Sequence, residues 1–384
     1  MKRVYLDHNA TTPMRPEVRA HFVEALERCG GNPASVHGAG RAARALLDQA
    51  RERVALVLGV HEDEVLFTSG GTESDNLAVL GCLRGAGPGA ALVTSAIEHS
   101  AVLEAAQAAE RDGHRVTRLP VDSQGWIDPQ AALAALRASG PALLSVMAAN
   151  NEIGSLGPLE ELGRGLRALG KLRPTFHTDA AQALGRTPLA LREWGIDLAS
   201  FSAHKLGGPL GVGVLYKRKG LQLAALQYGG GQENGLRPGT ENVPAISAAA
   251  LAFELAERER VSYAARMREL CRSFWGQVQR VLPQARVNGP DPALESRLCN
   301  TLNLSLPGID GRVLVARLDL EGLEVSAGSA CASGSLEPSH VLLALGRTSD
   351  EARAGVRFSF GRGNDERDVD ASVDILRRIF SSSR

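Results

Sequence analysis

A glycine pair stands where an apolar run meets a helical pattern, at Gly70-Gly71-Thr72. Small residues let the backbone N–H groups at a helix start approach a phosphate, and the Thr72 hydroxyl can cap the helix or add another donor. A strand-to-helix turn that binds nothing has much the same composition. By itself, the segment leaves an anion site and a plain turn equally open.

Two ionisable side chains each follow a later apolar run. Asp179 ends one run, at the sheet edge where open α/β folds bind ligands, although capping a helix is the commoner use of an Asp after a strand. Lys205 follows the next run among small residues, either as a surface charge or as an amine whose pKa is lowered by desolvation. Taken in order, an anion site, a carboxylate and an amine are the three groups that pyridoxal phosphate needs, for its phosphate, ring nitrogen and aldehyde.

The five cysteines differ in their surroundings. Cys331 stands among Gly, Ser and Ala, which predicts an exposed, flexible loop and a reactive thiol. Cys82 and Cys271 lie in helical patterns with apolar neighbours and are expected in the core, while Cys29 and Cys299 stay undecided. The odd number and the lack of any Cys-x-x-Cys pair argue against a disulfide framework and a zinc knuckle, and favour a reducing compartment.

The elements that must position these groups follow an α/β pattern. From about residue 16 to 217, helical periodicity alternates with short β runs, which is typical of βαβ units and a mainly parallel sheet. We expect seven strands, at residues 65–68, 91–94, 115–120, 142–147, 175–178, 198–202 and 213–216. Helices are expected between them, at residues 41–58, 72–83, 101–112 and 159–169.

Length predicts two domains, because 384 residues exceed the roughly 250 to 300 at which one hydrophobic core stops growing. A long helical pattern, opened by Pro244 and running to about residue 282, is interpreted as the bridge between them. Beyond it we expect strands near 301–306 and 355–360 and helices near 311–320 and 365–380. The predicted division is a large domain of residues 12–255 and a small C-terminal domain of residues 256–384, joined by residues 1–11.

Composition excludes several classes of partner. Lys plus Arg and Asp plus Glu number 43 each, so the zero net charge gives no reason to expect nucleic acid or an acidic membrane as a partner. No apolar stretch reaches the 18 or so residues of a spanning helix, and the start has no apolar signal region, so we expect a cytoplasmic protein.

These motifs, in this order, resemble those of the cysteine desulfurases of the NifS/IscS type, within the class V aminotransferase group. The resemblance runs from Tyr5 to about Arg362. It rests on Asn9-Ala10-Thr11-Thr12-Pro13, Gly31-Asn32-Pro33-Ala34-Ser35, Thr68-Ser69-Gly70-Gly71-Thr72-Glu73-Ser74, Glu98-His99, Asn150-Asn151-Glu152-Ile153-Gly154, His204-Lys205, Gly239-Thr240-Glu241-Asn242, Gly328-Ser329-Ala330-Cys331 and Arg357-Phe358-Ser359.

The resemblance implies an α/β, fold-type I enzyme that depends on pyridoxal phosphate, with a seven-stranded large domain and a smaller α+β domain. Lys205 would bond to the cofactor's aldehyde, Asp179 would pair with its ring nitrogen and Gln182 with its ring hydroxyl. His99 would stack on the ring and move protons. Asn151 would lie beside the ring and near the substrate.

The phosphate would be held by Gly71, Thr72, Ser202 and His204, and by Thr240 from the neighbouring subunit of a homodimer. Arg357, always charged and able to bind bidentately, would hold the substrate carboxylate. No metal ion is expected.

The implied reaction converts L-cysteine to L-alanine and leaves the sulfur on Cys331 as a persulfide. An acceptor protein or iron-sulfur scaffold would then take the sulfur, for iron-sulfur clusters, other cofactors or tRNA. The alternatives are a selenocysteine lyase or another class V lyase or aminotransferase, which need the loop thiol less, and a catalytically idle sulfur carrier, against which the intact Lys205, Asp179 and His99 argue.

Overall fold

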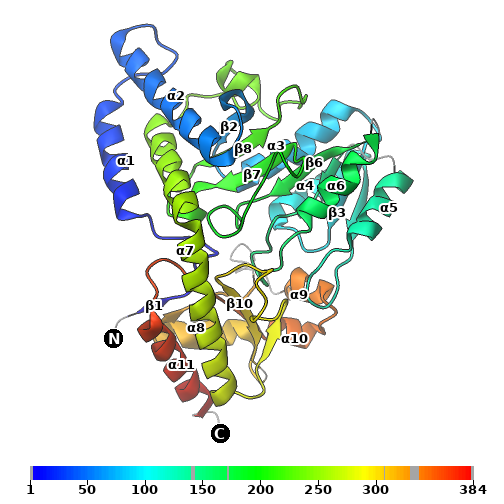
Figure 1. The fold of residues 1–384 in the computed structure, drawn as a ribbon, viewed down its shortest axis with the longest axis vertical. Helices are drawn as coiled ribbons and strands as arrows, with labels where there is room; N and C mark the ends of the chain where they lie inside the picture. The colour runs from blue at the N-terminus through cyan, green and yellow to red at the C-terminus, as the bar shows by residue number, and fades with distance from the viewer. Residues whose placement is uncertain (1–2, 140–142, 171–172, 307, 329–336, 382–384) are drawn as a thin grey trace.

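A seven-stranded sheet forms the centre of the larger part of the chain (Figure 1). The computed structural model describes residues 3–139, 143–170, 173–306, 308–328 and 337–381. The strand order is β2-β8-β7-β6-β5-β3-β4, and β8 alone runs antiparallel to its neighbours. The strands are β2 (Val65–Thr68), β3 (Ala91–Ser95), β4 (Arg115–Leu119), β5 (Leu143–Ser145), β6 (Thr175–Asp179), β7 (Leu198–Ser202) and β8 (Gly213–Lys217). All seven lie where the sequence predicts them, which confirms the fold class.

Helices pack against both faces of this sheet. One of them, α3, packs on β7 and β8 and against α4, while α1 and α2 pack against α7. Two helices that begin at a proline, α1 and α5, are absent from the sequence-based expectations. The helices are α1 (Pro16–Arg28), α2 (Gly38–Leu58), α3 (Gly71–Ala86), α4 (Ser100–Arg111), α5 (Pro129–Ser139), α6 (Leu159–Arg167) and α7 (Val243–Val281), with short 3-10 turns at η1 (Glu62–Glu64), η3 (Ala203–Leu206) and η4 (Gln232–Gly235).

The smaller part is built around an antiparallel sheet of order β12-β10-β9. Strand β1 pairs in parallel with β11 and contacts α11, so the start of the chain lies beside its last helix. The elements are β1 (Val4–Tyr5), β9 (Arg286–Asn288), β10 (Thr301–Ser305), α8 (Gly311–Leu320), β11 (Leu323–Glu324), α9 (His340–Ala344), α10 (Ser349–Arg353), β12 (Gly355–Ser359) and α11 (Glu366–Ser381).

Helix α7 links two hydrophobic cores (Figure 1). Its first half, up to Ala256, packs into the core of the larger part, where Phe253 contacts Phe201 edge to face. Its second half, from Ala264, packs into the core of the smaller part. The two cores separate close to the domain boundary expected at residue 255, and that boundary stays a prediction. None of the helices in the described part of the chain has the length and apolar character to span a membrane.

Candidate active site

The sheet brings the predicted site residues to one edge. Parallel strands β3, β5, β6 and β7 end at the same side, as does β2, because β2 and β7 both run antiparallel to β8. The carboxyl ends of parallel strands are where open α/β folds bind ligands. The residues carried by these ends are Gly71 and Thr72, His99, Asn151, Asp179 and Gln182, and Ser202, His204 and Lys205.

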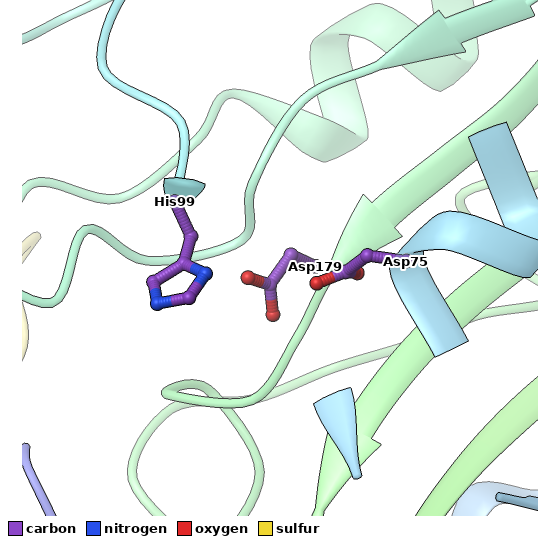
Figure 2. A group of neighbouring side chains, drawn as sticks. All are labelled: Asp75, His99 and Asp179. Carbon is purple, nitrogen blue, oxygen red and sulfur yellow. The ribbon is translucent and has the colours of Figure 1, made fainter. Parts of the chain in front are cut away.

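His99 and Asp179 face each other at this edge (Figure 2). His99 is the N-cap of α4, and its Nδ1 accepts a hydrogen bond from the N–H of Ala101 at 3.1 Å. The ring is therefore fixed in orientation, and Nε2 is the nitrogen that can carry or exchange a proton. Asp179, the last residue of β6, accepts a hydrogen bond from the N–H of Ala181 at 2.9 Å through Oδ1.

A third side chain, Asp75 in the first turns of α3, completes this group and has no role in the sequence-based expectations (Figure 2). Ligand atoms of Asp75, His99 and Asp179 lie within 4.8 Å of one another. Burial, followed by the charge of Asp179, raises the pKa of Asp75 well above its usual range. The three groups have donors that a metal ion can use, and the expectation of no metal stays a prediction.

Lys205 lies in η3, directly after β7, and its amine is held by the N-terminal segment. Its Nζ donates hydrogen bonds to the carbonyl oxygens of Asn9 at 2.6 Å and Ala10 at 2.7 Å. The carbonyl of Asn9 also accepts from Nε2 of Gln182 at 3.0 Å. Asn9 Nδ2 donates to the carbonyl of Asn151 at 3.0 Å, so one residue joins three predicted site residues.

Gln182 has a second neighbour that the sequence reasoning missed. Arg186, buried four residues later in the same turn segment, donates through Nη1 to Oε1 of Gln182 and to Oδ1 of Asn9, the latter at 3.1 Å. Its Nη2 donates to the carbonyl of Lys205 at 3.2 Å. Arg186 therefore fixes the amide of Gln182 with its Nε2 donor turned toward Asn9.

The start of α3 has the features of a phosphate site. The N-cap Gly70 offers no side-chain cap to the backbone N–H groups of this 16-residue helix. A Cβ at Gly71 would stand 3.7 Å from Cβ of Ser202, so the end of β7 lies against the helix start, and Thr72 is exposed there. Free N–H groups at a helix start beside a hydroxyl favour a bound anion.

His204 lies beside this region in the neutral form. Its Nδ1 is 3.0 Å from Oγ1 of Thr11. Burial, followed by the positive charges of Lys205 and Arg186, lowers the pKa of His204 to about 4. A neutral imidazole can donate one hydrogen bond to a phosphate but contributes no charge.

Arg357, on β12 of the smaller part, reaches the same region from the other side. It is 1% exposed, and its Nη1 donates to the carbonyl of Asn151 at 3.3 Å. Its Nη2 forms an ion pair with Oδ1 of Asp7 at 2.6 Å. Among the described residues, Nε has no hydrogen-bond partner. The two residues expected to bind substrate are thus in contact, and Asp7, which the sequence did not single out, shares the guanidinium.

Thr240 is not part of this group in the single chain. It is exposed in the loop between η4 and α7. Its expected contact with a phosphate in a partner subunit stays a prediction.

The proposed nucleophile, Cys331, lies outside the described residues. Among the cysteines that are described, Cys82, Cys271 and Cys299 are buried and Cys29 is partly so, as predicted for Cys82 and Cys271. Burial raises the pKa of all three buried thiols, that of Cys299 to about 11. Thiols of this kind are poor nucleophiles at neutral pH.

Comparison with known proteins agrees with this geometry. The pattern of the class-V aminotransferase family matches residues 4–371. A protein of Dictyoglomus turgidum named "Cysteine desulfurase IscS" is 43% identical over 386 residues, which cover 100% of this chain and 96% of that protein. One of Bacillus subtilis named "Putative cysteine desulfurase IscS 1" is 40% identical, with 99% of this chain and 100% of that protein covered.

Solved structures are similar over the whole chain. A "NifS-like protein" matches with a TM-score of 0.91 and 38% identity, covering 99% of each chain. A structure described as "SspA in complex with cysteine" matches with a TM-score of 0.79 and 32% identity, covering 93% of this chain and 98% of that one. Matched by the family pattern along nearly its whole length, this chain belongs to the class-V aminotransferases, whose cysteine desulfurase members depend on pyridoxal phosphate.

Proposed function

We propose that this protein is a cysteine desulfurase, which converts L-cysteine to L-alanine and moves the sulfur to Cys331 and then to an acceptor. One observation carries the proposal. An amine, a carboxylate and an uncapped helix start meet at one sheet edge, with Arg357 and Asn151 in contact beside them. The named relatives at about 40% identity support the choice of this reaction within the family.

The residues present fit pyridoxal phosphate. The N–H groups at the start of α3, with Ser202 beside them, would hold its phosphate, and Asp179 would hold a proton on its ring nitrogen. Asp75 is buried beside Asp179, and its raised pKa favours the neutral form of Asp75 there. When bound, the cofactor supplies an aldehyde for the substrate amine and a ring that accepts electrons from the substrate carbon.

The chain's own groups handle the protons and the substrate carboxylate. Lys205 Nζ, which the carbonyls of Asn9 and Ala10 orient, would take the proton from the substrate's α carbon. Nε2 of His99, opposite the nitrogen fixed by α4, would return a proton as alanine forms. Arg357 would hold the carboxylate and so set the orientation of the α carbon.

The sulfur step assigned to Cys331 is an attack of its thiolate on the substrate sulfur. A sulfur–sulfur bond forms as the carbon–sulfur bond breaks, the electron pair of that bond stays with carbon, and carbon then gains a proton. A thiolate on an acceptor protein or iron-sulfur scaffold would then attack the outer sulfur. A new sulfur–sulfur bond would form as the bond to Cys331 breaks, and Cys331 would leave as a thiolate. The pKa values of the buried thiols, raised by burial, support giving this role to Cys331.

The proposal includes a cytoplasmic homodimer in which Thr240 completes the phosphate site of the partner. The exposure of Thr240 supports this, as does the aromatic ring of Tyr228, which is 89% exposed in the single chain. The odd number of cysteines supports a reducing compartment.

The test is a product analysis of purified protein loaded with pyridoxal phosphate. With L-cysteine and a thiol reductant, we expect equal amounts of alanine and sulfide, and neither from a Cys331→Ala variant. Formation of pyruvate or of an amino-transfer product instead would contradict the proposal, and turnover of selenocysteine alone would identify the lyase alternative.

A further inference from the structure

The segment that contains Cys331 has two described flanks, residues 326–328 and 337–340. The first flank bonds to strand β12, which carries Arg357, and the second bonds to the loops that carry His99 and Asn151. The reaction outlined above assigns these bonds no role.

The flank before Cys331 is bonded to the substrate-binding strand. Ser326 and Arg357 exchange backbone hydrogen bonds, with the N–H of Arg357 2.7 Å from the carbonyl of Ser326. Two residues later, Gly328 has a φ of 73°, where glycine is favoured. A Cβ at Gly328 would stand 3.7 Å from Oε2 of Glu152 and 3.7 Å from Cβ of Ser339, so the two flanks meet at Glu152.

The flank after Cys331 is bonded to the loops that follow two strands of the large sheet, β3 and β5. The hydroxyl of Ser339 donates to Oε2 of Glu152 at 2.6 Å, and the same residue is the N-cap of α9. The next residue, His340, donates through Nε2 to the carbonyl of Glu98 at 3.0 Å. Glu98 directly precedes His99, and Glu152 directly follows Asn151.

The carboxylate that accepts the Ser339 hydrogen bond is buried, while Ser339 itself is half-buried. Glu152 is 1% exposed, and its backbone N–H donates to Oδ1 of Asn150 at 2.9 Å. A small apolar cluster joins the same elements, and its members are Ile97, Ile153, Val341, Leu342, Leu345 and Ala352. A hydrogen bond to a carboxylate out of water is stronger than one at the surface.

Building on the proposed function, we propose that Glu152 and Ser339 are positioning residues for sulfur transfer. Their hydrogen bond fixes the base of the segment that carries Cys331 to the residues beside the cofactor and substrate. Removing it is expected to slow transfer of sulfur to Cys331 and to leave binding of cofactor and cysteine as they are.

The test compares single turnovers of four single variants and of the Glu152→Ala/Ser339→Ala double variant, all loaded with pyridoxal phosphate. Glu152→Ala and Ser339→Ala each remove the bond, Ser339→Thr keeps a hydroxyl, and Thr348→Ala removes the N-cap of neighbouring α10 without touching Glu152. The readouts are the absorbance change when cysteine is added and the mass of the Cys331 peptide with time. Both alanine variants should form the persulfide about tenfold more slowly, with a normal absorbance change.

Further outcomes distinguish a loss of the Glu152–Ser339 hydrogen bond from a loss of the α9 N-cap and from a failure of the proposed function. Glu152→Ala leaves the N-cap of α9 in place. If both alanine variants form the persulfide equally slowly, and the double variant is no slower, the defect comes from the hydrogen bond that the two residues share. Ser339→Thr and Thr348→Ala should transfer sulfur at the rate of the unchanged protein. Normal transfer in Glu152→Ala and Ser339→Ala, or an equal loss in Thr348→Ala, would overturn the inference. If the unchanged protein forms no persulfide, the proposed function fails instead.

Discussion

Replacing Arg357 should show how much this residue contributes to substrate binding, as distinct from its ion pair with Asp7. Arg357 is fully buried, and it offers one nitrogen to Asp7, one to Asn151 and a third, Nε, to no described residue. A bidentate contact to the substrate carboxylate contributes about 3 kcal/mol, at about 1.5 kcal/mol for each charge-assisted hydrogen bond. Arg357→Ala should therefore lower kcat/KM for cysteine about a hundredfold, mainly by raising KM.

The same change also carries a cost in stability. Asp7 would lose its cation, but it is 18% exposed and can turn to water, so we expect a loss of about 1 to 2 kcal/mol rather than the 3 or more of a sealed pair. Chemical denaturation of the variant measures this loss independently of activity. Arg357→Lys keeps the positive charge but loses the bidentate guanidinium, so its kcat/KM should lie between those of the unchanged protein and Arg357→Ala.

Asp7→Asn is the matched control for this prediction. It leaves the guanidinium and an acceptor oxygen in place while removing the carboxylate that competes for Nη2. The KM for cysteine should stay the same or fall, and initial-rate measurements over a range of cysteine concentrations give it directly. If Asp7→Asn raises KM as much as Arg357→Ala does, Arg357 acts by holding the smaller part of the chain in place and not by binding the substrate carboxylate.

Three further predictions concern Lys205, Thr240 and His177, a histidine buried in β6. Lys205→Ala should still bind pyridoxal phosphate through the phosphate and ring contacts, measured by equilibrium dialysis, but make no alanine; normal alanine production would remove Lys205 from its role. Diluted monomers should lose cofactor if Thr240 completes a partner's site, and a monomer in light scattering with full cofactor and activity would refute the shared site. Burial lowers the pKa of His177 to about 3, so the stability that the neutral ring contributes is complete above about pH 6.5 and falls by about 1.4 kcal/mol per pH unit below that pH. The His177→Gln variant should lack this pH dependence when its free energy of unfolding is measured at pH 7, 6 and 5. An unchanged pH dependence in the variant would show that other groups cause it.

The strands and the main helices could be predicted because short apolar runs alternate with amphipathic stretches of different period. The runs at residues 65–68 and 198–202 became β2 and β7 with the same bounds. Helix α1 escaped because only Val18 and Ala25 of its residues are buried, which leaves almost no apolar periodicity. Strands β1, β9 and β11 have two or three residues each, too few to show a pattern.

The site was predicted where the side chain itself carries the chemistry, as at Asp179 and Lys205. It was missed where a residue acts through its backbone or through distant neighbours. Asn9 appeared only within a motif of the resemblance, yet its carbonyl receives Lys205 and its amide reaches residues 142 and 292 positions away. Asp75 lies in a helical sequence pattern, which does not indicate that its carboxylate lies beside Asp179 in the folded chain. Such roles depend on the folded arrangement of segments.

The most direct test of the proposed function is to locate the sulfur taken from cysteine. Protein loaded with pyridoxal phosphate is exposed briefly to L-cysteine, alkylated to trap persulfides, digested and analysed by mass spectrometry. We predict one extra sulfur, on the peptide that contains Cys331, with an equal amount of alanine released. Extra sulfur on the peptides of Cys29, Cys82, Cys271 or Cys299 instead, or alanine without any persulfide, would contradict the account.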